Sequence, residues 1–224
     1  MIDNILHKFH ICGENLAALP TGALWWANKR ILCVSDLHLG KSERVMRRGG
    51  PMLPPYDTQE TLSRLDADIQ HHAPETVICL GDSFDDLQAA ESLNDDTKLW
   101  IQRLQAGRRW IWIEGNHDPG PVQLGGTHLA EFRVDDLTFR HVADPDYSAD
   151  ISGHYHPKFS LRSRGRTISR PCFVYDNARL MLPAYGSFTG GLSVMDANIR
   201  CLFGPNARVV MTGKTTHVLP LPQS

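Results

Sequence analysis

The 224-residue chain has a formal net charge of −2, a pI near 6.6, 42% apolar residues and 21% charged residues. This is the composition of a soluble globular protein, and it excludes the strongly basic surface that is typical of tight nucleic-acid binders. Nucleic acid stays possible as a transient substrate, because active-site metal ions can supply positive charge. The five scattered cysteines form no CxxC pair, which argues against a disulfide framework or a zinc ribbon.

The same features bear on location and domain number. Residues 1–10 hold no apolar stretch of signal-peptide length, and no run in the chain approaches the roughly 20 apolar residues of a membrane span. Unpaired cysteines favour a reducing compartment. We therefore expect a cytoplasmic protein without a membrane anchor. No clear domain boundary is visible, and we expect a single domain over residues 1–224.

Five short apolar runs, each followed by a polar cluster, predict buried strands. In chain order they cover residues 30–35, 76–80, 110–114, 137–140 and 150–152. Trp110 and Trp112 lie within the third run and are expected in the core. Residues 49–55 are rich in glycine and proline and predict an irregular loop. Residues 162–170 predict a short basic connector, and further strands and turns are expected after Pro171.

Helical periodicity separates the first three predicted strands. Residues 57–72 place Leu62, Leu65 and Ile69 on one face of a helix. Residues 95–106 predict a second helix with its apolar face formed by Leu99, Ile101 and Leu104. Strand and helix therefore alternate, which predicts an α/β sheet with helices on both faces.

The polar clusters follow the carboxyl ends of the predicted strands, where sites of α/β sheets collect. Their candidate metal ligands carry only oxygen and nitrogen donors, which suits Mn, Fe or Zn and disfavours soft thiolate sites. Seven donors exceed the needs of one tetrahedral ion and suit two ions, provided that a carboxylate bridges them. The candidates are Asp36, His38, Asp82, Asn116, His141, His154 and His156, with Asp82 as the bridge.

Spacing and neighbours suggest how such a centre would work. Asp36 and His38, like His154 and His156, are two residues apart, so in an extended segment both would point to one side. Two divalent ions about 3.5–4 Å apart activate a water and neutralise phosphate oxygens. His117 follows Asn116 and is the candidate catalytic residue, with Asp118 expected to orient its imidazole. The pattern predicts hydrolysis of a phosphate ester at a dinuclear metal centre.

Four ordered motifs give the chain a family resemblance. Asp36-x-His38, Gly81-Asp82-x-x-Asp85, Gly115-Asn116-His117-Asp118 and Gly153-His154-x-His156 resemble the motif set of the calcineurin-like metallophosphoesterase superfamily. The resemblance covers about residues 30–190 and implies an α/β fold, a two-sheet α/β sandwich flanked by helices.

The resemblance also implies residue roles. One metal would be held by Asp36, His38, Asp82 and His156, and the other by Asp82, Asn116, His141 and His154. His117 matches the family's catalytic histidine. Asp85 matches a carboxylate that supports the ligands, although the residues alone equally allow it to cap the following helix.

A narrower resemblance rests on segments 33–43, 48–51, 53–56 and 184–191. These resemble the ligase-associated DNA damage response endonuclease group, PdeM. That resemblance implies a Mn-dependent phosphodiesterase of DNA repair, acting on single-stranded or damaged DNA alongside a DNA ligase. The alternative is a phosphatase or cyclic-nucleotide phosphodiesterase for small molecules. A non-catalytic scaffold is disfavoured, because the ligand set and His117 are complete.

Two further segments are candidates for substrate contacts. The basic residues Lys41, Arg44, Arg47 and Arg48 follow the first motif. They form either a rim that binds substrate phosphates or a solvated face. Residues 186–188 are expected to close the site from below with backbone donors.

Overall fold

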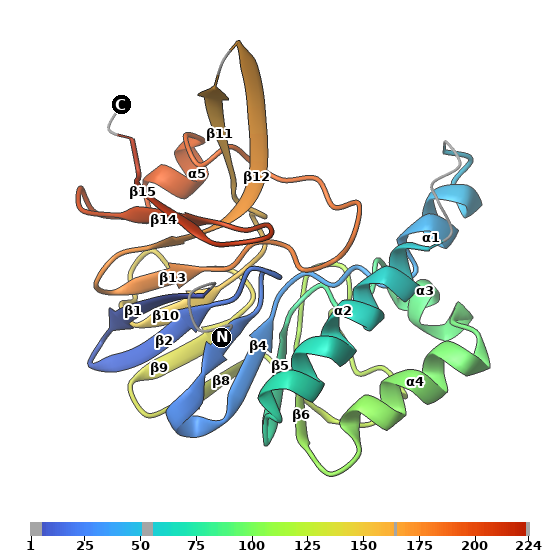
Figure 1. Cartoon of the computed structure of the whole chain (residues 1–224). Helices are drawn as coiled ribbons and strands as arrows, with labels where there is room; N and C mark the ends of the chain where they lie inside the picture. The colour runs from blue at the N-terminus through green and yellow to red at the C-terminus, as the bar shows by residue number, and fades with distance from the viewer. Residues whose placement is uncertain (1–5, 51–55, 164, 223–224) are drawn as a thin grey trace.

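The computed structural model describes residues 6–50, 56–163 and 165–222. Its two mixed β-sheets stack face to face (Figure 1). Along the first sheet the described strands run in sequence order. β4 pairs in parallel with β5, β5 with β6 and β6 with β7, while β1 to β4 pair antiparallel. The strands are β1 (His7–Ile11), β2 (Glu14–Ala18), β3 (Leu24–Trp26), β4 (Ile31–Val34), β5 (Thr76–Leu80), β6 (Arg109–Ile113) and β7 (Thr127–Leu129).

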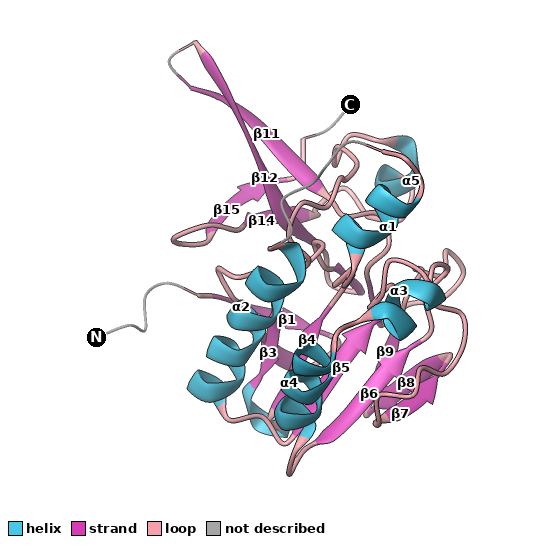
Figure 2. Ribbon diagram, turned by 90° about the vertical axis from the view of Figure 1, so that its right-hand side faces the viewer, coloured by secondary structure: helices cyan, strands magenta, loops and turns pink. Residues whose placement is uncertain are grey.

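The second sheet has the described strand order β15-β14-β12-β13-β10-β9-β8, and β11 pairs with β12. Within it, β10 pairs in parallel with both β13 and β9. The hairpin of β11 and β12 projects beyond the rest of the molecule (Figure 2). The strands are β8 (Glu131–Val134), β9 (Leu137–Arg140), β10 (Asp150–Ser152), β11 (Lys158–Ser163), β12 (Arg166–Tyr175), β13 (Arg179–Met181), β14 (Arg208–Met211) and β15 (His217–Pro220).

The longer helices cover the outer face of the first sheet (Figure 1). Three described helices start at side-chain caps: Asp86 accepts a hydrogen bond from the backbone of Ala89 at the start of α3, Asn94 from Thr97 at the start of α4, and Asp196 from Asn198 at the start of α5. None of the described helices is long and apolar enough to cross a membrane. The helices are α1 (Lys41–Arg47), α2 (Asp57–His72), α3 (Leu87–Ser92), α4 (Asp95–Gln105), α5 (Ala197–Arg200) and the 3-10 helix η1 (Ala27–Lys29).

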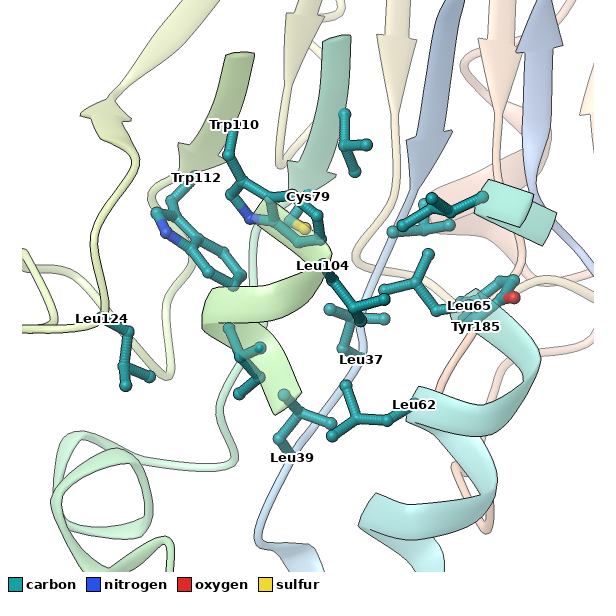
Figure 3. Packing of buried hydrophobic residues seen from close by; sticks show 14 of the residues in the cluster. Leu37, Leu39, Leu62, Leu65, Cys79, Leu104, Trp110, Trp112, Leu124 and Tyr185 are labelled. Carbon is teal, nitrogen blue, oxygen red and sulfur yellow. The ribbon is translucent and has the colours of Figure 1, made fainter. Parts of the chain in front are cut away.

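Three apolar cores hold the layers together. On the outer face of the first sheet, Trp110, Trp112 and Cys79 pack against Leu62 and Leu104 of the helices (Figure 3). Between the sheets, strand residues such as Ile78 and Ile111 pack against Phe139, Ile151 and Phe173. A third core lies between the second sheet and α5. These layers confirm the two-sheet sandwich.

Three sequence predictions need correction. The described helices that cover the first sheet lie on one of its faces, because the second sheet covers the other. Leu99 is 65% exposed, since residues 99 and 101 lie about 200° apart around a helix and cannot share a face. Residues 162–170 form the tip and flanks of the β11–β12 hairpin where they are described, because Gly165 supplies a left-handed turn. Residues 51–55 of the predicted 49–55 loop lie outside the described residues.

Candidate metal centre

The candidate ligands follow strand ends from both sheets. Asp36 and His38 lie beyond β4, Asp82 beyond β5 and Asn116 beyond β6. From the second sheet, His141 follows β9, while His154 and His156 follow β10. Because the parallel strands of each sheet point their carboxyl ends to the same edge, residues more than 100 positions apart in sequence meet there.

The ligand loops are not extended, contrary to the sequence prediction. Asp36, His38, Asp82, His154 and His156 have φ angles of 53°, 46°, 43°, 70° and 47°. Non-glycine residues rarely adopt this left-handed region, and such strain concentrates at functional sites. The chain therefore turns at each of these residues.

In the loop after β4, successive residues alternate between the candidate metal centre and the apolar core. Leu37 and Leu39 pack into the helix-side cluster (Figure 3), whereas Asp36 and His38 belong to the candidate centre. Burial of the two leucines, at 2% and 1% exposure, fixes the loop. The hydrophobic spacing thus holds the two candidate ligands in place.

Two glycines allow the loops to approach each other closely. A Cβ atom on Gly81 would lie 2.2 Å from Nδ1 of His141, and one on Gly115 would lie 2.1 Å from the amide nitrogen of Asp82. Both separations are far below van der Waals contact, so any side chain here would displace a candidate ligand.

One group of donor atoms comes from Asp36, His38 and His156, which lie within 4.8 Å of one another. Oδ1 of Asp36 is 3.1 Å from Nε2 of His156. Nε2 of His38 is 3.4 Å from Nε2 of His156. Nδ1 of His38 lies 2.9 Å from Oδ1 of Asp85, so the carboxylate lies beside this ring nitrogen and Nε2 is the nitrogen that faces the donor group.

A second group comes from Asp82, His141 and His154, with Asn116 beside it. Nε2 of His141 lies 3.3 Å from Oδ2 of Asp82, 3.0 Å from Oδ1 of Asn116 and 3.2 Å from Nδ1 of His154. The Nδ1–H of His141 donates to the carbonyl of Leu80 at 3.1 Å, so its Nε2 lone pair faces the group.

This donor set fits divalent ions. In each group two ring nitrogens face each other without an intervening acceptor, and buried carboxylates lie beside them. Burial alone would raise the pKa of Asp82, but its contacts with His141 and with the backbone N–H of His117 outweigh burial and lower that pKa to about 2. Asp82 is therefore an anion at neutral pH, as a ligand must be.

Asp36 is held by contacts that the sequence prediction missed. Its Oδ2 accepts hydrogen bonds from the Ser35 hydroxyl at 2.5 Å and from the backbone N–H of His154 at 3.1 Å. Both contacts leave Oδ1 for the ligand group. The only available signal was a hydroxyl directly before Asp36, which is too common to be specific.

Asp85 acts through both of its carboxylate oxygens. One lies 2.9 Å from Nδ1 of His38, and the other accepts a hydrogen bond from Arg44 at 2.7 Å. The residue supports a candidate ligand, whereas the helix-capping alternative is wrong because Asp86 caps α3.

His117 is oriented by a backbone group. Its Nδ1 lies 2.9 Å from the carbonyl oxygen of Asp85, and its backbone N–H donates to Oδ1 of Asp82 at 2.8 Å. Nε2 is consequently directed away from the Asp85 carbonyl, 4.0 Å from Oδ2 of Asp82.

Asp118 does not orient this imidazole, contrary to the sequence prediction. Its carboxylate oxygens accept backbone N–H groups of Ser83, Phe84 and Gly115. Asp118 thus ties the loop after β5 to the loop after β6 and determines where Asp82 and Asn116 lie. An acceptor-only side chain suits this position, since all three partners are donors.

The predicted basic rim is largely neutralised. Arg44 pairs with Asp85, Arg47 pairs with Glu43 and Asp86, and Arg48 lies 3.8 Å from Asp86. Lys41 begins α1, whose preceding residue Gly40 is left-handed. The geometry favours a structural role for Arg44, and the substrate role of this segment stays a prediction.

Candidate donor groups for divalent ions therefore lie at one edge of a two-sheet sandwich. Residues 29–189 match the family model described as calcineurin-like phosphoesterase. The chain belongs to this family and is a metal-dependent phosphoesterase.

Among solved structures, the chain is similar to the nuclease MPE of Pseudomonas putida, with 29% identity, a TM-score of 0.75, and coverage of 96% of this chain and 100% of that one. A conserved uncharacterised protein of Streptococcus pneumoniae TIGR4, described as a predicted phosphoesterase, shares 15% identity over 85% and 88% of the two chains with a TM-score of 0.31, too low to support an inference. No curated protein matches the sequence.

Proposed function

We propose that this phosphoesterase is a dinuclear phosphodiesterase that cleaves DNA. The observation that carries the proposal is the pair of adjacent donor groups, with Asp82 beside His141 and the backbone of His117. Similarity to a nuclease over nearly the whole of both chains supports nucleic acid as the substrate.

The proposed metal assignment follows the two groups. Asp36, His38 and His156 hold one ion, and Asn116, His141 and His154 hold the other, with Asp82 shared between them. When bound, two divalent ions activate the attacking water and neutralise charge on the phosphate oxygens. We propose Mn as the native metal, and oxygen and nitrogen donors equally accept Fe or Zn.

His117 is the proposed general acid. Its Nδ1–H donates to the Asp85 carbonyl, which holds the ring and leaves Nε2 for the substrate. A protonated Nε2 donates to the leaving oxygen as the ester bond breaks. The side chain of His117 is 31% exposed, so a substrate oxygen can reach it.

The test is hydrolysis of single-stranded DNA, duplex DNA, cyclic nucleotides and an aryl phosphate in the presence of Mn²⁺. We expect cleavage of DNA and its loss in Asp36→Asn, which removes a ligand charge while conserving shape. Cleavage of cyclic nucleotides or aryl phosphate monoesters without any cleavage of DNA would contradict the proposed substrate. An association with a DNA ligase stays a prediction.

A further inference from the structure

A loop after β13 connects the candidate metal centre to an adjacent groove. The backbone N–H of Gly186 donates to the carbonyl of Asp36 at 3.0 Å, and the backbone N–H of Leu192 donates to that of Tyr155 at 3.1 Å. The backbone N–H of Ser187 donates a hydrogen bond to the hydroxyl of Thr61 in α2 at 3.0 Å. Figure 1 shows this loop, in orange, extending from the second sheet toward α2. Both ends of the loop are therefore fixed to ligand-bearing segments.

The groove beside this loop has a volume of about 460 Å³. It lies between α2, residues 170–171 of β12 and the loop itself, and its lining includes Arg64, Arg170 and Phe188. This size is within the range of small-ligand sites and exceeds the needs of a single nucleobase.

Phe188 is an exposed aromatic residue in a strained backbone conformation. Its side chain is 51% exposed although it lines the groove. Its φ angle is 58°, a region that bulky residues rarely adopt. Neither burial nor backbone preference explains a phenylalanine here, and strain of this kind concentrates at ligand-binding positions.

Among the described residues, Arg64 and Arg170 form no ion pair with a carboxylate, unlike the arginines of α1. Arg64 donates to the Tyr185 carbonyl, packs over the Tyr185 ring, and has a buried Nε without a described partner. Arg170 donates a hydrogen bond to the backbone carbonyl of Ser169. Glu60 is the one acidic residue in the described lining, and within the part of the chain that the structure describes it forms no ion pair with either arginine.

We propose that this groove is a nucleotide subsite for single-stranded nucleic acid, in which Phe188 stacks on the base next to the scissile phosphate. Arg64 and Arg170 bind the phosphate of that nucleotide. The inference rests on the proposed function and adds the strand form of its substrate. An aromatic platform flanked by arginines that form no ion pair is how proteins bind unpaired bases without reading their sequence.

The experiment compares two single-stranded substrates of about 12 nucleotides, oligothymidylate and an abasic oligomer of the same backbone. With Mn²⁺ present, Phe188→Ala should raise KM for oligothymidylate by roughly 10-fold, the low end of base–aromatic stacking, and leave kcat unchanged. KM for the abasic oligomer should not change. Phe188→Trp should restore a low KM, because it retains the stacking face.

Arg170→Gln should raise KM for both oligomers and reduce its dependence on salt, since a phosphate contact is lost whether or not a base is present. Arg170 is exposed, so this variant tests the cation without disturbing folding. The matched controls are Leu99→Ala on α4 and Arg133→Gln on β8, which lie on other elements and should leave KM unchanged.

An unchanged KM of Phe188→Ala for oligothymidylate would overturn the subsite, as would an equal rise for both oligomers. Cleavage of duplex DNA without cleavage of oligothymidylate would also overturn the subsite, whereas failure of the wild-type protein to cleave DNA of either strand form would overturn the proposed function. The two failures are therefore distinguishable.

Discussion

Replacing Asp85 by asparagine tests how the metal centre is supported. The carboxylate is 1% exposed and contacts Nδ1 of His38 at 2.9 Å with one oxygen and Arg44 at 2.7 Å with the other. Burial alone would raise the pKa of Asp85, but the contacts with His38 and Arg44 outweigh it and hold that pKa well below its usual range. The residue is therefore an anion that strengthens His38 as a ligand.

The magnitude follows from these two bonds. Asparagine can still accept from His38, but a hydrogen bond to a charged partner is worth about 1.5–3 kcal/mol against about 0.5–1.5 kcal/mol for a neutral one. The amide nitrogen of the new side chain would also face Arg44, so that pair is lost. We expect Asp85→Asn to raise the dissociation constant of the ion held by His38 by about 10- to 100-fold, or about 1.4–2.8 kcal/mol.

The assay is calorimetric titration with Mn²⁺, followed by kcat at saturating Mn²⁺. Because Asp85→Asn keeps the backbone carbonyl that orients His117, kcat should recover when the metal is saturating. Asp86→Asn is the matched control, since asparagine also caps a helix and the described contacts of the Asp86 side chain include no candidate ligand. Unchanged Mn²⁺ affinity in Asp85→Asn would refute the reasoning.

Three other substitutions separate the remaining roles. His117→Ala should lower kcat by about 10²- to 10⁴-fold and keep both metals, and loss of metal would make His117 a ligand. Asp82→Ala should lose most bound metal and nearly all activity, as measured by metal analysis after gel filtration, and full retention of two ions would disprove the shared ligand. Asp118→Asn should lower the free energy of unfolding by about 1–3 kcal/mol in urea titrations, because one accepting oxygen becomes an NH2 group that faces a backbone N–H donor. Unchanged stability would contradict that.

Much of this arrangement is visible in the sequence. Short apolar runs ending in polar residues located β4, β5, β6, β9 and β10, because buried strands need continuous apolar side chains. Because the carboxyl ends of these strands lie at the same edge, the sequence alone predicted that the candidate ligands lie close together. The helix over Asp57–His72 was predicted with the bounds that the structure shows.

Other features depend on tertiary contacts that a sequence pattern does not contain. Asp118 contacts the loop after β5, which is 34 residues away in sequence, so adjacency to His117 suggested the wrong partner. Arg44 pairs with Asp85 across 41 residues, a contact that its charge alone did not indicate. Arg64 had no motif around it, and only the fold shows that it lies beside the Tyr185 backbone.

The central claim is that two divalent ions share this centre. A crystal of the protein grown with Mn²⁺, measured by anomalous scattering at the Mn edge, tests it most directly. The account predicts two peaks about 3.5–4 Å apart on either side of Asp82, one beside His38 and His156 and the other beside His141 and His154. A single fully occupied ion, with the second group of side chains turned elsewhere, would contradict it.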